Sequence, residues 1–140
     1  MSRVAFFSSL GILTLAACSS GDSSNGTTSG PSPNTITISN FTFNPDPLVV
    51  PASSTVTTVT VINTDPTNVH TATSEAAAND FPQHAQAADG GFVFDTNNIP
   101  TGSSATFTVP AGLPSGTIQP YFCVQHTNMM KNPNPTIQIK

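Results

Sequence analysis

The strongest constraint on the fold of this chain is a series of short runs in which apolar and polar residues alternate. In the first run, at 35–40, Ile36 and Ile38 fall on one face, and the threonines and serine fall on the other. Because β-branched and aromatic residues with a period of two are typical of strands, and helical periodicity is almost absent, an all-β chain is predicted. Similar runs rich in Thr, Val, Ile and Phe lie at 55–63, 69–74, 92–94, 104–109, 117–124 and 136–140.

Turn-forming sequences rich in Pro, Gly, Asn and Asp separate these runs, at 44–47, 65–66, 100–102 and 114–116. Short strands at this spacing predict an antiparallel β-sandwich of about seven or eight strands with Greek-key connections. One longer insertion is expected at about 75–91. Since β-sandwiches serve adhesion, binding and catalysis alike, function has to be argued from a site.

The start of the chain has a different character. Residues 1–17 contain one basic residue, Arg3, followed by an apolar run and by small residues before Cys18. This pattern is typical of an export signal, and its apolar run is too short for a membrane-spanning helix. The sequence LAAC at 15–18 resembles the bacterial lipobox, which implies cleavage before Cys18 and lipidation of that residue. The alternative is an ordinary signal peptide that contains a cysteine.

Residues 18–34 are rich in Ser, Gly and Asn and are expected to form a flexible tether. The composition changes abruptly at Thr35, so one domain is predicted at 35–140, with about a hundred residues to build a compact core. The lipobox resemblance implies a position on the periplasmic side of a bacterial membrane. Ser19 after the lipobox cysteine favours the outer membrane over the inner one, and the outer leaflet of a single-membrane cell is the alternative.

The charge balance excludes one class of partner. From Cys18 onward the chain has two cationic side chains and seven acidic ones, a formal charge of −5. A surface this poor in Lys and Arg has no electrostatic means of binding nucleic acid.

Residues able to do chemistry gather in one segment, YFCVQHTNMMKN at 121–132. It contains Cys123, then His126, then Met129 and Met130. If Cys18 carries lipid, Cys123 has no intramolecular disulfide partner. In an oxidising compartment its thiol must then be buried, paired between chains or held by a metal.

The donor types in this segment favour copper. A thiolate with imidazoles suits copper or zinc, but a thioether favours copper, and structural zinc normally takes four strong Cys or His ligands. Two His and one Cys in a trigonal arrangement with a weak axial Met describe a blue-copper site. The second His must come from His70, in the alternating run NVHTATS, or from His84, in a polar Ala-rich loop. A ligand on a strand is held more rigidly, which favours His70 and leaves His84 as a solvated loop residue.

These segments together resemble the cupredoxins, the plastocyanin and amicyanin family of small blue copper proteins. The resemblance spans 35–140. The run 35–65 is similar to the family's opening strands, and NVHTATS is similar to the segment with the first His ligand. FDTNNIPTGSSATFTV is similar to the middle turn and strand, and YFCVQHTNMM is similar to the ligand loop. It implies a cupredoxin-like sandwich that binds one copper ion, Cu(I) or Cu(II), through His70, Cys123 and His126.

The resemblance also implies an axial methionine. Met129 has the shorter His–Met spacing of amicyanin-like members and is favoured, and Met130 is the alternative. Two residues depart from the family pattern: Thr127 replaces a common Pro after the second His, and Thr71 replaces an Asn that often joins the two ligand segments. A hydroxyl at Thr71 can make a similar bridge.

The function implied is the transfer of single electrons between redox partners in the cell envelope, by a monomer whose His126 edge reaches the surface. The alternative is copper storage or delivery through the same ligands without a redox partner. An enzyme is not expected, because copper oxidases and nitrite reductases need additional His clusters and this chain has three His in total. A metal-free sandwich for adhesion or assembly is a further alternative.

Overall fold

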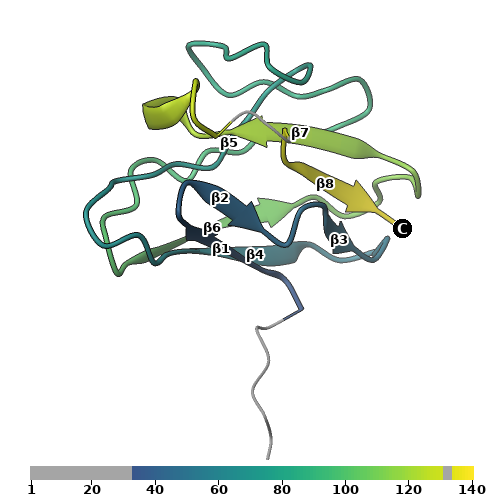
Figure 1. Ribbon diagram of the computed structural model, residues 1–140. Helices are drawn as coiled ribbons and strands as arrows, with labels where there is room; N and C mark the ends of the chain where they lie inside the picture. Colours follow the sequence, from purple (N-terminus) through teal and green to yellow (C-terminus); the bar gives the residue numbers. More distant parts are fainter. Residues whose placement is uncertain (1–32, 131–133) are drawn as a thin grey trace, which may run out of the picture.

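Two four-stranded β-sheets dominate the computed structural model, which describes residues 33–130 and 134–140 (Figure 1). The first sheet has the order β2-β1-β4-β6 and contains β1 (Thr35–Ser39), β2 (Thr42–Asn44), β4 (Thr57–Asn63) and β6 (Ser104–Val109). The second has the order β3-β8-β7-β5 and contains β3 (Leu48–Val50), β5 (Thr73–Ser74), β7 (Ile118–Phe122) and β8 (Thr136–Ile139). A 3-10 helix, η1 (Val124–His126), follows β7.

The export segment at 1–17, Cys18 and nearly all of the tether at 18–34 lie outside the described residues. Within 33–130 and 134–140, no helix has the length and apolar character needed to cross a membrane.

The predicted β-sandwich is confirmed, but its sheets are mixed and not purely antiparallel. The pairs β1–β4 and β3–β8 are parallel, and the other pairs are antiparallel. The chain leaves the first sheet after β2, forms β3 in the second sheet and returns to place β4 beside β1. Alternation in the sequence reports which face a side chain takes and not the direction of the neighbouring strand, so it could not predict these parallel pairs.

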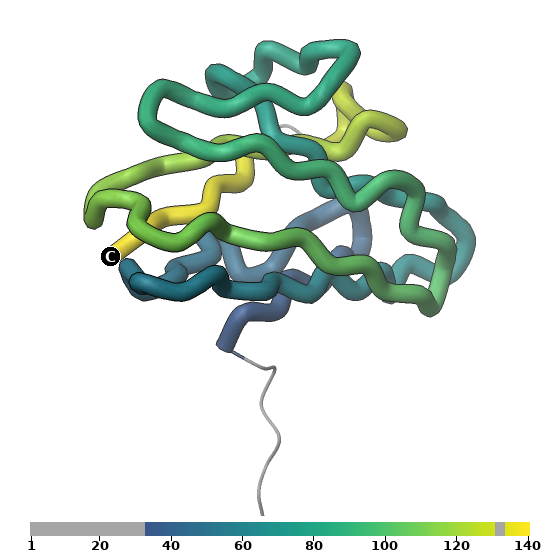
Figure 2. Tube along the Cα trace, turned by 180° about the vertical axis from the view of Figure 1, so that it is seen from behind, coloured from purple at the N-terminus to yellow at the C-terminus, as the bar shows by residue number. Residues whose placement is uncertain are grey.

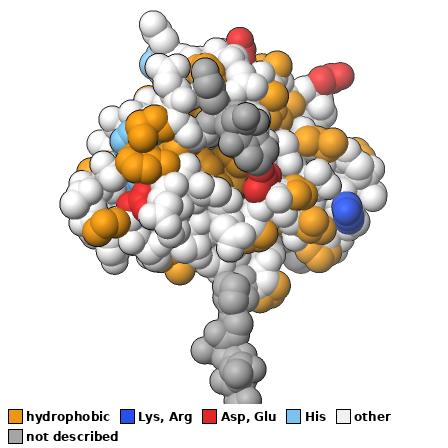
Figure 3. Space-filling model, in the orientation of Figure 1, with side chains coloured by type: hydrophobic (Ala, Val, Ile, Leu, Met, Phe, Trp, Pro, Cys, Tyr) orange, Lys and Arg blue, Asp and Glu red, His pale blue; other side chains and the backbone are white. Residues whose placement is uncertain are grey.

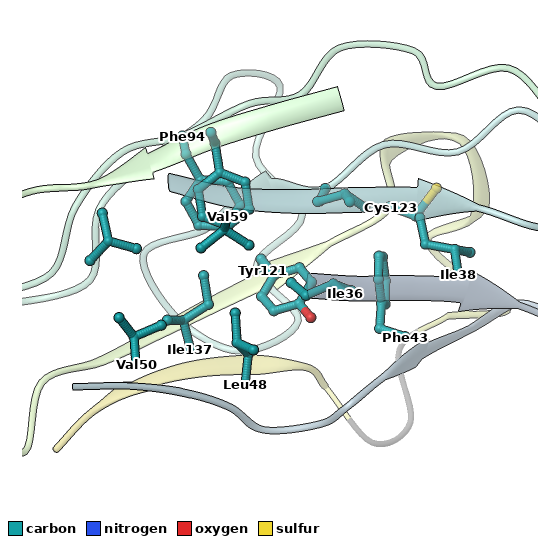
Figure 4. Packing of buried hydrophobic residues seen from close by; sticks show 14 of the residues in the cluster. Ile36, Ile38, Phe43, Leu48, Val50, Val59, Phe94, Tyr121, Cys123 and Ile137 are labelled. Atoms are coloured by element: carbon teal, nitrogen blue, oxygen red, sulfur yellow. The ribbon is translucent and has the colours of Figure 1, made fainter. Parts of the chain in front are cut away.

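The core lies between the two sheets (Figure 4). Each fully buried aliphatic or aromatic side chain contributes about 1.5–3 kcal/mol to folding, so the two layers form a stable scaffold for residues at their ends. The core side chains from the first sheet are Ile36, Ile38, Phe43, Val59, Val61, Phe107 and Val109, and those from the second are Leu48, Val50, Tyr121, Ile137 and Ile139.

The prediction of a strand at 92–94 was wrong. Phe92 and Phe94 are buried in the core, but the segment forms no strand. Isolated bridges at Thr73–Asp95 and His70–Ile99 lie beside it, and the Ser74 N–H donates to the Phe94 carbonyl at 3.0 Å. Apolar residues two positions apart can be buried by a loop as well as by a strand. The segment 69–74 is likewise mostly irregular, with only its last two residues in β5.

A two-residue turn joins β1 to β2 and was not predicted from the sequence. Its central residues Asn40 and Phe41 both have positive φ, 49° and 57°, and Ser39 pairs with Thr42. This is the geometry of a type I′ hairpin, in which Gly normally occupies the second position. A bulky residue with positive φ is an outlier that the surrounding structure must stabilise.

The insertion at 75–91 covers the outer face of the second sheet (Figures 1 and 2). Phe81 packs edge-on against Phe122 with ring centroids 5.5 Å apart. Glu75 is fully buried, and its carboxylate accepts backbone hydrogen bonds from Asn79, Asp80 and Phe81. The insertion is therefore an integral layer of the domain.

Candidate metal centre

Three side chains from two distant parts of the chain meet at one end of the sandwich. His70 precedes β5 and is held by backbone hydrogen bonds with Ile99 in both directions. Cys123 directly follows β7, where the alternation that points Tyr121 into the core also points the cysteine inward. His126 ends η1, one turn further on. The end of β7 and the turn of η1 thus aim the loop donors at His70.

The three donor atoms form a compact triangle. The Sγ atom of Cys123 lies 3.6 Å from Nδ1 of His70 and 3.6 Å from Nδ1 of His126, and all three atoms lie within 4.8 Å of one another. Metal bonds of about 2.1 Å to nitrogen and about 2.3 Å to sulfur, meeting at tetrahedral to trigonal angles, separate the two donors by about 3.6–3.8 Å. The triangle therefore has the size that one transition-metal ion requires.

A buried carboxylate holds the other side of His70. The Nε2 atom of His70 is 2.6 Å from Oδ2 of Asp65, and the two side chains are 0% and 3% exposed. Asp65 also accepts hydrogen bonds from the backbone N–H groups of Asn40 and Phe41 in the β1–β2 turn. From the sequence, Asp65 was interpreted only as part of an Asp-Pro turn, because two of its three partners lie 24 and 25 positions away.

Thr71 bridges the two ligand segments. Its backbone N–H donates to Sγ of Cys123 at 3.4 Å, and its hydroxyl accepts from the backbone N–H of Val124 at 2.9 Å. The expectation that a hydroxyl can join these segments is confirmed. The bridge restrains the cysteine and the start of η1 relative to the segment that carries His70.

One aromatic ring covers the two histidines. Phe41 packs edge-on against His70 and His126, with ring centroids 5.6 Å and 5.0 Å away, and the two imidazoles are 4.7 Å apart. Phe94 and Phe107 instead stack on each other within the core.

The pKa values of His126 and Asp65 are both lowered, which favours binding of a cation at the site. Burial lowers the pKa of His126 because it disfavours the imidazolium form, and nearby His70 lowers it further, against an opposing effect of Asp65. Burial acts to raise the pKa of Asp65, but the hydrogen bonds from Phe41, Asn40 and His70 outweigh it, so the pKa lies below its usual value. At neutral pH the imidazole of His126 is therefore unprotonated at one nitrogen, and Asp65 is an anion.

The two methionines differ in burial. Met129 is 60% exposed, whereas Met130 is 4% exposed and belongs to the same core cluster as Cys123. Both line a cavity of about 110 Å³. The cavity is also lined by Asn40, Phe41, Thr42, Phe43, Asp46 and Pro135. Burial favours Met130 as an axial ligand and the His–Met spacing favours Met129, so the axial position stays a prediction.

His84 lies apart from this triangle. Its side chain is exposed in the insertion, and the donor triangle among the described residues consists of His70, Cys123 and His126. The thiol of Cys123 is free and fully buried.

The comparisons with known proteins agree on the fold. A purple cupredoxin from Nitrosopumilus maritimus superposes with a TM-score of 0.54 at 18% identity, covering 76% of this chain and 98% of its own. Auracyanin from Roseiflexus castenholzii gives 0.53 at 17%, covering 76% and 94%, and auracyanin A from Chloroflexus aurantiacus gives 0.54 at 13%, covering 76% and 96%. No protein-family model matches the sequence. No curated protein sequence matches it either.

These superpositions span the sandwich, and the donor triangle lies at one of its ends. The structure therefore supports the cupredoxin resemblance that the ligand-loop motif suggested: the chain has the cupredoxin fold.

Proposed function

We propose that the protein is a mononuclear type 1 copper protein that carries single electrons. The observation that carries this proposal is the triangle of the Cys123 sulfur and two imidazole nitrogens, within 4.8 Å of one another, with His70 and Cys123 buried. A Cys and two His with a weak axial thioether form the donor set of blue-copper electron-transfer sites. The purple cupredoxin and the "blue" copper protein auracyanin A share the fold, which supports the same assignment.

A copper ion held by His70, Cys123 and His126 would supply a one-electron couple, and the chain restrains these ligands. His70 is held by Asp65 and Ile99, and Cys123 receives the Thr71 N–H. These restraints come from a packed sandwich core, so the ligands have little freedom to rearrange when the charge on the ion changes. Cys123 binds as a thiolate, which also explains how a single thiol persists in an oxidising compartment.

His126 offers the route for electrons. It is the one partly exposed member of the triangle, and the exposed apolar side chains of Val124 and Met129 flank it in sequence. Figure 3 shows hydrophobic side chains beside histidine atoms at the end of the molecule where η1 lies. A redox protein that docks here would approach the ion through one imidazole.

The cellular setting follows from the leader segment. We infer a lipid anchor on Cys18 and a periplasmic position, with the outer membrane favoured, and a monomer that meets redox partners in the cell envelope. Copper storage or delivery is the alternative use of the same ligands. The complete burial of His70 and Cys123 favours the carrier, because a delivery site must release its ion.

A copper titration followed by visible spectroscopy tests the proposal. We expect one equivalent of Cu(II) per chain to produce an intense blue to purple or green colour from charge transfer between thiolate and copper. A one-electron reductant should bleach the colour, and reoxidation should restore it without loss of the ion. A colourless complex would contradict the copper site, and loss of copper on reduction would favour delivery over electron transfer.

The axial ligand is tested by a matched pair of substitutions, Met129→Leu and Met130→Leu. Removing a weak thioether should keep the colour and change the reduction potential, since the axial ligand tunes the potential. We expect the change in Met130→Leu, because Met130 is the buried member of the pair. A change confined to Met129→Leu would support the assignment that the spacing favours.

A further inference from the structure

The contact between Asp65 and His70 determines which nitrogen of the imidazole is free. The carboxylate oxygen 2.6 Å from Nε2 is an acceptor, so Nε2 carries the proton. The Nδ1 atom is then unprotonated, and it is the atom that faces Sγ of Cys123. In a neutral imidazole the partner of one nitrogen sets the tautomer, so the metal-binding tautomer is selected before any ion enters.

The carboxylate is itself held by its surroundings. The three groups that point at its oxygens are all donors: the N–H groups of Asn40 and Phe41 and Nε2–H of His70. The backbone N–H of Asp65 donates to the side chain of Asn63 at 3.0 Å. Three donors converging on one carboxylate suit its anionic form. Among the described residues, His70 is the one basic side chain in ion-pair contact with it.

A buried anion next to a ligand affects the two oxidation states unequally. Cu(II) carries one more positive charge than Cu(I), so a fixed negative charge in a poorly polarisable interior stabilises Cu(II) more. A carboxylate that accepts the second N–H of a ligating imidazole also raises the basicity of that ligand. Both effects act in the same direction.

The same carboxylate supports the cover of the site. Its hydrogen bonds with Asn40 and Phe41 stabilise a turn in which both residues have positive φ, and the Phe41 ring packs on both histidines. The positive φ of Phe41 thus has a structural role, because it places an aromatic ring over the two histidines. A Gly at this position of the turn would have no side chain to cover them.

We propose that Asp65 is a positioning residue that presents Nδ1 of His70 to the metal and, as a buried anion, lowers the reduction potential of the site. This inference rests on the proposed function, because it concerns the same ion. It assigns a role to Asp65, which is not one of the three donor residues, and it predicts that Asp65 lowers the reduction potential.

The test is the substitution Asp65→Asn in the copper-loaded full chain. The amide is the same size but neutral, so we expect the ratio of Cu(II) to Cu(I) affinity to fall about tenfold, within the range for outer-shell partners. For a one-electron couple this raises the potential by about 59 mV. Asp65→Ser, a smaller neutral acceptor, is the second variant and should shift the potential in the same direction.

Glu75→Gln is the matched control. Glu75 is as buried as Asp65 and also accepts backbone N–H groups, but its partners lie in the insertion and at Asn134, and none is in the donor triangle. It should lower stability without moving the potential. An unchanged or lower potential in both Asp65 variants, or an equal shift in the control, would overturn the proposal.

A second measurement does not require copper. Nitrogen-15 NMR of the metal-free wild-type chain should show His70 as the tautomer protonated at Nε2, with that preference weakened in Asp65→Asn. A tautomer protonated at Nδ1 in the wild type would overturn the positioning role. If the chain fails to form a coloured copper complex, the proposed function fails, and the NMR result still decides whether Asp65 orients His70.

Discussion

Cys123→Ser is expected to abolish the visible colour of the copper complex and to lower the Cu(II) affinity more than about 100-fold, beyond the loss caused by removing an outer-shell partner. The colour arises from the thiolate, and a serine hydroxyl stays protonated at neutral pH and is a harder donor. The sulfur is also the atom 3.6 Å from both imidazole nitrogens, so its loss removes the centre of the donor set. Titration with Cu(II) under visible spectroscopy measures both effects.

The chain provides its own control for this experiment. Cys18→Ser makes the same chemical change outside the domain predicted at 35–140, so the copper complex should keep its colour and stoichiometry. Circular dichroism should show that the metal-free Cys123→Ser chain still folds. A coloured one-to-one complex in folded Cys123→Ser would place the thiolate or the metal elsewhere and would contradict the proposed site.

Phe94→Ala is expected to lower the free energy of unfolding by about 3–5 kcal/mol, the range for a truncated buried Phe. The Phe94 ring stacks on Phe107 of the first sheet at a centroid distance of 4.0 Å, and it lies 5.9 Å from Tyr121 of the second. It thus joins the two layers of the core (Figure 4). Its removal is expected to leave a cavity between them. In a domain of this size the melting temperature should fall by roughly 10–30 °C.

Val93→Ala is the matched control, because Val93 is the chain neighbour of Phe94 but is 59% exposed. Truncation of an exposed residue should change stability by no more than about 0.5 kcal/mol. Chemical denaturation of the two variants measures the difference. Equal losses would mean that the segment 92–94 does not pack in the core as described.

Several features of the site could be anticipated from single segments. Cys123 and His126 lie in one loop, and His70 was preferred over His84 because it lies in an alternating run; the structure brings His70 to the other two and leaves His84 exposed. The bridging role of the Thr71 hydroxyl was also anticipated. Each of these inferences depended on residue types and short spacings.

Other features depended on contacts that no local pattern contains. Asp65 meets the N–H of Asn40 across 25 positions, and the sequence around it indicates only a turn. Phe41 adopts a positive φ that its residue type disfavours, because Asp65 and the hairpin hold it there. The loop after η1 turns so that adjacent methionines take opposite environments, one buried and one exposed.

The sequence alone determined that the chain forms a β-sandwich and that a thiolate, imidazoles and thioethers are available in it. Side-chain alternation and donor chemistry are properties of neighbouring residues, so they can be interpreted without coordinates. Only the tertiary structure decided the parallel pairs, the burial of one methionine and the carboxylate behind His70. These depend on how segments as far apart as the 53 positions between His70 and Cys123 pack together, and many packings share the same local patterns.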